Sequence, residues 1–246
     1  MTTKSAVVHD ASAQIRTRHR VQLRRRLIRT FVPLVCLALI AAAVWALWFS
    51  DWFVAASIEV SGAVRVTREE IVTAAEIEFG TPLMRLDVEA IASRVSQIPV
   101  VAAATVDWEL SGVVRIAVTE RVAVYNIPSA GEYLLVDATG TGYLRLDEPE
   151  SYLPVVIVAH DESSQSQRLM ADAAVIVMAL PESVRSKMEL MTASTPDTFS
   201  IRLENNATVF WGGAEQSELK AEVVDGLLKV KATYYDVSSP GHPATR

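Results

Sequence analysis

Residues 104–118 read ATVDWELSGVVRIAV and contain a strand pattern that occurs twice. In the first half, apolar residues alternate with polar ones, which is typical of a strand with one buried face. The inward set is Ala104, Val106, Trp108 and Leu110. Ser111-Gly112 is a plausible two-residue hairpin connection. In the second half, the inward set is Val114, Ile116 and Val118. The stretch therefore predicts an antiparallel hairpin.

Upstream of this hairpin, the pattern predicts one more strand and two helices. Residues 57–60 alternate as a strand and stop at Ser61-Gly62. Residues 67–70, TREE, form a capping box, so a helix begins after Thr67, and we expect it to end in the turn 79–82. A second helix begins at Asp87 and ends before Pro99. The resulting β-α-α-β-β order predicts two helices that cover one face of a small sheet.

From about residue 122 the chain becomes richer in strands. The helix before Pro181 has Leu169, Ala173, Ile176 and Leu180 inward, and a helix capped by Ser217 has Leu219, Val223 and Leu227 inward. The expected strands are 122–126, 133–136, 143–146, 155–159, 188–193, 199–203, 208–211 and 233–237. The predicted fold class is α+β, with a second, strand-rich domain after the first.

Charge divides the 246 residues sharply. The net charge is −6, yet residues 1–30 carry eight basic residues against Asp10 alone, so this tail has a charge of +7 and the remainder −13. Between them Phe31 to Phe49 contains no charge, and a helix of that length spans roughly 28 Å, close to the thickness of a hydrocarbon core. The tryptophans Trp45, Trp48 and Trp52 follow as an interfacial belt would.

These features predict a membrane helix over residues 31–52, with the basic tail 1–30 mostly disordered and cytoplasmic and the acidic portion outside. A cleaved signal peptide is the alternative, but the basic region and the apolar run are both longer than such peptides have. The tail could also be a nucleic-acid arm. Attraction to phospholipid explains it more simply beside a membrane, and we expect no nucleic-acid partner.

The sequence shows few signs of a catalytic, metal-binding or cofactor-binding site. His9, His19, His160 and His242 have no partner at metal-ligand spacing, and the one cysteine, Cys36, lies in the predicted span. Gly140 and Gly142 fit a turn better than a dinucleotide site. No nucleophile elbow, phosphate loop or S-x-x-K motif is present. We therefore expect no catalytic activity, cofactor or metal.

Seven stretches resemble the FtsQ/DivIB family of bacterial division proteins, and the first four resemble its POTRA domain. They are 58–62 (IEVSG), 79–87 (FGTPLMRLD), 98–106 (IPVVAAATV), 118–121 (VTER), 136–140 (VDATG), 153–155 (LPV) and 235–240 (YDVSSP). Lys220, which follows Trp211-Gly212-Gly213, also resembles a family pattern. The chain departs from the family by having no proline after Arg121 and none at Ser111-Gly112.

The resemblance implies a POTRA domain over residues 54–121, a β domain over 122–239 and a polar tail over 240–246. It further implies a non-enzymatic divisome scaffold in the cell membrane at the division septum. Such a protein links FtsB/DivIC-like and FtsL-like bitopic partners, contacts other divisome membrane proteins and helps control septal peptidoglycan synthesis. The alternative is a membrane-anchored cell-envelope enzyme or a peptidoglycan-binding protein.

Residues 233–237 follow the last predicted helix, so we expect this strand at or near a sheet edge. An edge offers unpaired N–H and C=O groups to which a partner strand can add, and the family resemblance favours that role. An ordinary terminal strand covered by the tail is the alternative. The predicted partner-binding residues are Thr233, Tyr234, Tyr235, Asp236, Val237 and Ser238.

Overall fold

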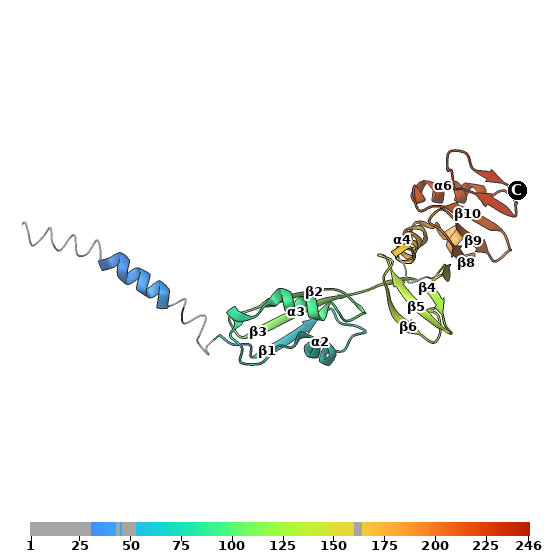
Figure 1. The fold of residues 1–246 in the computed structure, drawn as a ribbon. Helices are drawn as coiled ribbons and strands as arrows, with labels where there is room; N and C mark the ends of the chain where they lie inside the picture. The colour runs from blue at the N-terminus through green and yellow to red at the C-terminus, as the bar shows by residue number, and fades with distance from the viewer. Residues whose placement is uncertain (1–30, 43–44, 46–52, 160–163) are drawn as a thin grey trace, which may run out of the picture. The chain divides into compact units, whose positions relative to one another are not determined.

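The computed structural model describes residues 31–42, 45, 53–159 and 164–246 (Figure 1). Residues 31–42 form a helix whose side chains are exposed. The remainder of the predicted span 31–52, apart from residue 45, and the whole predicted tail 1–30 lie outside the described residues. Within the described ranges, no helix combines the length and the apolar character that a membrane crossing requires.

The first sheet has three strands in the order β1 (Ser57–Ser61), β3 (Val113–Glu120) and β2 (Val101–Trp108). Between β1 and β2 the chain forms α2 (Arg68–Ala75), a short 3-10 helix η1 (Leu83–Arg85) and α3 (Val88–Val95). Each α-helix buries two residues one turn apart, Ile71 and Ala75 in α2 and Ile91 and Val95 in α3. The predicted β-α-α-β-β order is confirmed, and η1 is an addition to it.

Helix α2 begins where it was predicted to begin but ends earlier. The Oγ1 atom of Thr67 accepts a hydrogen bond from the N–H of Glu70 at 3.3 Å, as a cap does. The helix stops at Ala75 because Glu76 takes the left-handed conformation, with φ of 49°. Arg94 of α3 then donates from Nη2 to the Ala75 carbonyl at 2.6 Å. The predicted end at residues 79–82 is wrong because Glu76, a non-glycine residue, takes the left-handed conformation and caps the helix with its N–H on the Thr73 carbonyl.

The hairpin between β2 and β3 also differs from its prediction. Strand β2 ends at Trp108, which is only half-buried, and Leu110 is 57% exposed, so its inward assignment is wrong. The connection has four residues, 109–112, and Gly112 closes it by donating from its N–H to the Glu109 carbonyl at 2.9 Å. The inward residues of β3, Val114, Ile116 and Val118, are all buried as predicted.

The second sheet is a local antiparallel meander of β4 (Ala123–Ser129), β5 (Glu132–Asp137) and β6 (Gly142–Leu146). Ala130 and Gly131 connect β4 to β5, and both have positive φ, 52° and 92°. This is the backbone that a two-residue hairpin loop requires. All three strands were predicted, and β4 extends three residues beyond the predicted 122–126.

The third sheet has six strands in the order β12-β11-β10-β9-β8-β7. Four of them are β7 (Val156–Val158), β8 (Met188–Ala193), β9 (Phe199–Leu203) and β10 (Thr208–Gly212). The other two are β11 (Tyr234–Asp236) and β12 (Ala244–Thr245). Strands β8 and β9 have the predicted bounds. The spatial order of the strands repeats their order along the chain.

Two pairs in this sheet are parallel, β7 with β8 and β10 with β11. Two parallel neighbouring strands must be joined by a crossover connection, and in each of these two pairs the crossover contains helices. The first crossover contains α4 (Ser164–Ala179) and α5 (Glu182–Arg185), and the second contains α6 (Ser217–Leu227). The inward residues predicted for α4 are all buried, whereas α5, which follows Pro181, was not predicted.

Helix α6 buries part of the predicted face and a neighbouring set of residues. Val223 and Leu227 are partly buried against the core as predicted, but Leu219 is 47% exposed. The most deeply buried residues of the helix are Ser217, Lys220, Ala221 and Val224. These four positions also share one helical face. The two polar residues, Ser217 and Lys220, are buried because each forms a hydrogen bond with β10 or with the turn after it. Ser217 accepts a hydrogen bond from Nε1 of the fully buried Trp211 at 3.1 Å, and Lys220 donates to Gly213.

Candidate functional site: the β11 edge and its adjoining pocket

Strand β11 carries the predicted partner-binding residues and lies between β10 and β12. It runs parallel to β10, with Tyr235 opposite Val209. The bonds to β10 continue past both ends of the strand. Thr208 donates from its N–H to the Thr233 carbonyl, and Val237 donates from its N–H to the Phe210 carbonyl, each at 2.9 Å. The predicted strand 233–237 is therefore present, and its Val237 amide is engaged inside the sheet.

The two tyrosines of β11 differ in burial. Tyr235 is 3% exposed, and its hydroxyl donates to the Val230 carbonyl at 2.8 Å and accepts from the Ala232 N–H at 3.1 Å. Tyr234 is half-buried, and the guanidinium of Arg246 lies 5.3 Å from its ring centroid. Tyr235 therefore anchors the strand, whereas the Tyr234 ring stays partly exposed beside Arg246.

The outer side of β11 is occupied by β12. Asp236 pairs with Ala244 and Tyr235 with Thr245 in an antiparallel ladder. The Arg246 carbonyl accepts the N–H groups of Thr233 and Tyr234 at 2.9 and 3.0 Å, and the Arg246 N–H donates to the Tyr234 carbonyl at 2.9 Å. Residues 241–246 are all exposed. The predicted tail 240–246 thus contains a strand, and β11 is the second strand from the edge.

The chain turns sharply after β11. The Oδ1 atom of Asp236 accepts from the N–H of Ser238 at 3.0 Å and from its hydroxyl at 2.7 Å. A Cβ at Gly212, whose φ is 74°, would lie 2.8 Å from the Ser238 Cβ. Close packing of this turn on β10 therefore requires glycine at position 212.

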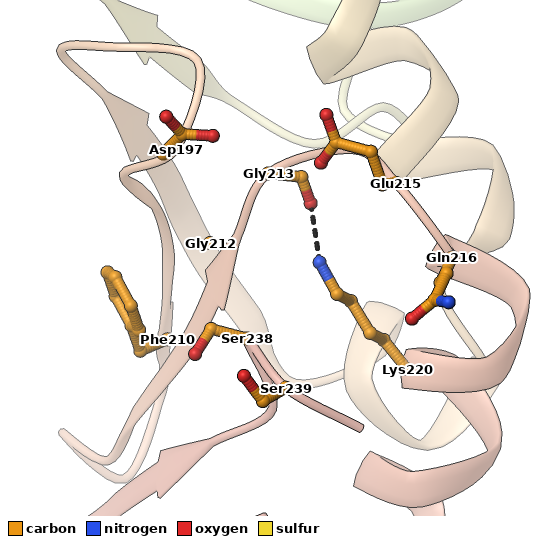
Figure 2. A pocket seen from close by; sticks show the side chains of 9 residues that line it. All are labelled: Asp197, Phe210, Gly212, Gly213, Glu215, Gln216, Lys220, Ser238 and Ser239. Atoms are coloured by element: carbon orange, nitrogen blue, oxygen red, sulfur yellow. Dashed lines mark hydrogen bonds between the residues drawn. The ribbon is translucent and has the colours of Figure 1, made fainter. Parts of the chain in front are cut away.

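A polar pocket of about 330 Å³ adjoins this turn (Figure 2). Figure 2 shows the Lys220 side chain extending from α6 toward the Gly213 carbonyl, to which Nζ donates at 2.8 Å. Lys220 is only 3% exposed. Burial lowers the pKa of Lys220, and the carboxylates of Glu215 and Asp197 oppose that shift. The pocket is lined by Asp197, Phe210, Gly212, Gly213, Glu215, Gln216, Lys220, Ser238 and Ser239.

The VTER stretch at residues 118–121 ends in Glu120 and Arg121, whose side chains bind different partners. The Oε1 atom of Glu120 accepts the N–H groups of Val64, Arg65 and Val66 at 2.7, 2.8 and 3.0 Å. Partial burial raises the pKa of Glu120, but these three hydrogen bonds outweigh it, and the net pKa lies below the ordinary value.

Arg121 is paired with Asp137, the aspartate of the 136–140 stretch. Nη1 of Arg121 donates to Oδ2 of Asp137 at 2.5 Å, and Nε donates to the Pro99 carbonyl at 3.1 Å. Oδ1 of Asp137 accepts the N–H groups of Thr139 and Thr141, each at 2.9 Å. Burial raises the pKa of Asp137, but the hydrogen bonds from Thr139, Arg121 and Thr141 outweigh it, so the pKa is lowered. These contacts order the backbone around both stretches.

The structure brings the predicted residues Thr233 to Ser238 together as β11 and the turn after it. It does not place them at a free edge. Sequence reasoning missed the pocket, because its lining comes from the turn before β9, from β10, from α6 and from the turn after β11. Among the described residues, no three His, Cys, Asp or Glu side chains gather closely enough to hold a metal ion.

Comparisons with known proteins agree with this architecture. The POTRA domain of FtsQ type matches residues 53–121. The cell division protein FtsQ of Streptomyces venezuelae is 31% identical over 222 residues, which cover 87% of this chain and 82% of that protein. FtsQ of Streptomyces bingchenggensis is 30% identical over 93% of this chain and 89% of its own length. FtsQ of Mycolicibacterium smegmatis is 30% identical, with 90% and 67% covered. The chain therefore belongs to the FtsQ family of cell division proteins.

Proposed function

We propose that this chain is a non-enzymatic scaffold of the divisome. It recruits and links FtsB/DivIC-like and FtsL-like bitopic partners, contacts other divisome membrane proteins and helps control septal peptidoglycan synthesis. Membership of the FtsQ family supports the role in division. The absence of a recognisable catalytic motif in the sequence agrees with a scaffold.

The proposal includes a single membrane span over residues 31–52, with the N-terminus in the cytoplasm and the folded domains outside, at the division septum. Two features of the sequence support this topology. The uncharged stretch Phe31 to Phe49 is long enough to cross a hydrocarbon core, and the charge changes from +7 before it to −13 after it.

Strand pairing on the outer side of β11 is the observation that carries the partner-binding role. An antiparallel strand, β12, already lies there, so the N–H and C=O groups of β11 have the geometry for strand addition. The proposed docking residues remain Thr233 to Ser238. Tyr234 is the most informative of them, because its N–H points outward to β12 and not inward to β10.

The test is a pair of variants at this position, Tyr234→Pro and Tyr234→Ala. Proline removes the outward N–H, whereas alanine keeps it and removes only the ring. We expect Tyr234→Pro to weaken capture of the organism's FtsB/DivIC-like protein by about tenfold or more, and Tyr234→Ala by much less. Capture is measured with the full chain in nanodiscs by surface plasmon resonance.

Circular dichroism and a thermal melt provide the folding control for both variants. A proline at Val237 could not test docking in the same way, because Val237 is fully buried and its N–H binds β10, so the substitution would disturb the sheet itself. Because the Tyr234 N–H also binds Arg246 of the chain itself, the comparison is repeated in chains that end after Gly241. If folded Tyr234→Pro chains of both lengths capture the partner as strongly as their parents do, then the outer side of β11 is not the docking site.

A further inference from the structure

Residues 242–246, here named the covering segment, occupy the side of β11 on which we propose that a partner docks. Their main-chain contacts comprise the Asp236–Ala244 and Tyr235–Thr245 pairs and the bonds of Arg246 to Thr233 and Tyr234. A partner strand on β11 would need the same N–H and C=O groups. Segment and partner therefore cannot both pair with β11.

The covering segment is attached by little beyond these backbone bonds. All of its residues are exposed, and its regular strand has only two residues. Two side-chain contacts add to the backbone bonds. The Thr233 hydroxyl donates to the Arg246 main-chain oxygen at 3.1 Å, and the Arg246 guanidinium lies 5.3 Å from the Tyr234 ring centroid. By contrast, the inner side of β11 is anchored by the buried Tyr235 and Val237. At this edge of the sheet, the covering segment is thus held less firmly than β11.

A partner could instead add outside β12, and the sequence argues against that arrangement. Pro240 and Pro243 lie just before β12, and proline offers no N–H to an added strand. A two-residue strand presents few groups on its outer side. An incoming strand on β11, however, replaces each bond that the segment gives up, so the exchange conserves backbone hydrogen bonds.

We propose that the covering segment is an intramolecular competitor which a partner strand displaces from β11. This inference rests on the proposed docking function and adds its regulation. The segment also indicates the chemistry of the partner strand: it is extended, antiparallel to β11, and places a basic side chain over the ring of Tyr234, where Arg246 lies. A basic strand also suits the −13 charge of the chain beyond residue 30.

Competition of this kind has a calculable effect on affinity. The apparent dissociation constant equals the intrinsic constant divided by the fraction of molecules with an open edge. If the segment covers β11 in about nine molecules of ten, its removal tightens binding by about tenfold. Locking the segment in place abolishes binding altogether.

A disulfide lock tests the proposal directly. Asp236 and Ala244 are paired directly across the antiparallel ladder, which places their Cα atoms within the range that a disulfide spans. The variant Asp236→Cys/Ala244→Cys is made in a Cys36→Ser background, because Cys36 is the only native cysteine. The matched control is Asp236→Cys alone, which loses the Asp236 bonds to Ser238 without forming a lock.

The probe is the extracytoplasmic segment of the organism's FtsB/DivIC-like protein, and the protein is the full chain in nanodiscs. We expect the oxidised double variant to lose capture and dithiothreitol to restore it, with no redox effect on the control. A chain that ends after Gly241 should capture the probe about tenfold more tightly than the parent.

The outcomes separate this inference from the docking proposal. If the oxidised lock captures the probe as well as the reduced form does, the segment need not leave, and the inference is overturned while docking stands. If neither the parent chain nor the shortened chain captures the probe, docking on β11 fails and the inference fails with it.

Discussion

Two regions of this molecule satisfy exposed backbone N–H groups by different means. At residues 64–66, one oxygen of the Glu120 carboxylate accepts three N–H groups at 2.7, 2.8 and 3.0 Å. At residues 233–234, the Arg246 carbonyl accepts two N–H groups at 2.9 and 3.0 Å. The first acceptor is a charged side chain on β3, the central strand of its sheet. The second is a main-chain oxygen beside β12, an outer strand.

The difference separates a permanent contact from an exchangeable one. A carboxylate that accepts N–H groups forms strong, charge-assisted bonds, and no strand can replace it without leaving that charge unpaired. The place of the Arg246 main-chain oxygen can be taken by a carbonyl oxygen of another strand. We therefore expect the contact of residues 64–66 with Glu120 to persist, and the contact of β11 with Arg246 to exchange.

The largest effect is expected at Arg121, beside Glu120. Arg121→Ala leaves the carboxylate of Asp137, whose side chain is only 7% exposed, without its cation. We expect the free energy of unfolding to fall by about 3 kcal/mol in a urea titration. The double variant Arg121→Ala/Asp137→Asn should recover part of this loss, because it leaves no buried charge. A loss below about 1 kcal/mol in the single variant would show that water already solvates Asp137.

A smaller effect is expected at Glu120 itself. Glu120→Ala removes the acceptor of three N–H groups near the surface, so we expect a loss of about 1–2 kcal/mol in unfolding free energy. Glu59→Ala is the matched control. Glu59 pairs with Arg115 at 3.4 Å, but both side chains are more than half exposed, and such pairs contribute little. If Glu120→Ala and Glu59→Ala lowered the unfolding free energy equally, Glu120 would stabilise the chain no more than an exposed ion pair does.

The charge of Glu120 also predicts a pH dependence. Its pKa in the folded chain lies below the ordinary value of 4.5, so the carboxylate contributes stability above that pH and loses it as the pH falls through the folded pKa. We expect Glu120→Gln to flatten the acid limb of a plot of stability against pH below about pH 4.5. An unchanged acid limb would assign that limb to other carboxylates such as Asp137.

The smallest effect is expected at Arg246. Arg246→Ala keeps the carbonyl that accepts the Thr233 and Tyr234 amides and removes only the guanidinium over the Tyr234 ring. We expect a loss of about 0.5 kcal/mol, which corresponds to amide hydrogen exchange about twofold faster at residues 233 and 234. Exchange at residues 64–66 should not change. Equal acceleration in both places would mean that the two regions open together.

Where a local pattern determined the structure, the sequence predicted it well. The alternation in 188–193 and 199–203 marks β8 and β9 to the residue, and Thr67 marks the start of α2. The failures arise where the residue type gives no such signal. The α2 end depends on the left-handed conformation of Glu76, a non-glycine residue. The burial of Ser217 and Lys220 in α6 depends on their hydrogen bonds to Trp211 and Gly213.

The candidate site was predicted in part for the same reason. Residues 233–237 carry strand-forming tyrosine and valine, so β11 has a local signal. The two residues of β12 have none, because they pair through the backbone and bury no apolar side chain. No sequence window contains the pocket, because its lining spans positions 197 to 239.

The strand order of the six-stranded sheet has a consequence for biogenesis. Strands β7 to β12 lie side by side in the order in which the ribosome makes them, so each new strand meets a neighbour that has already been synthesised. Such sequential pairing limits the time for which each new strand lacks a neighbour. Strand β11 can pair only after β10, its inner neighbour, is in place. The proposed docking strand thus pairs late, and a chain that is still being synthesised has no β11 edge to offer a partner.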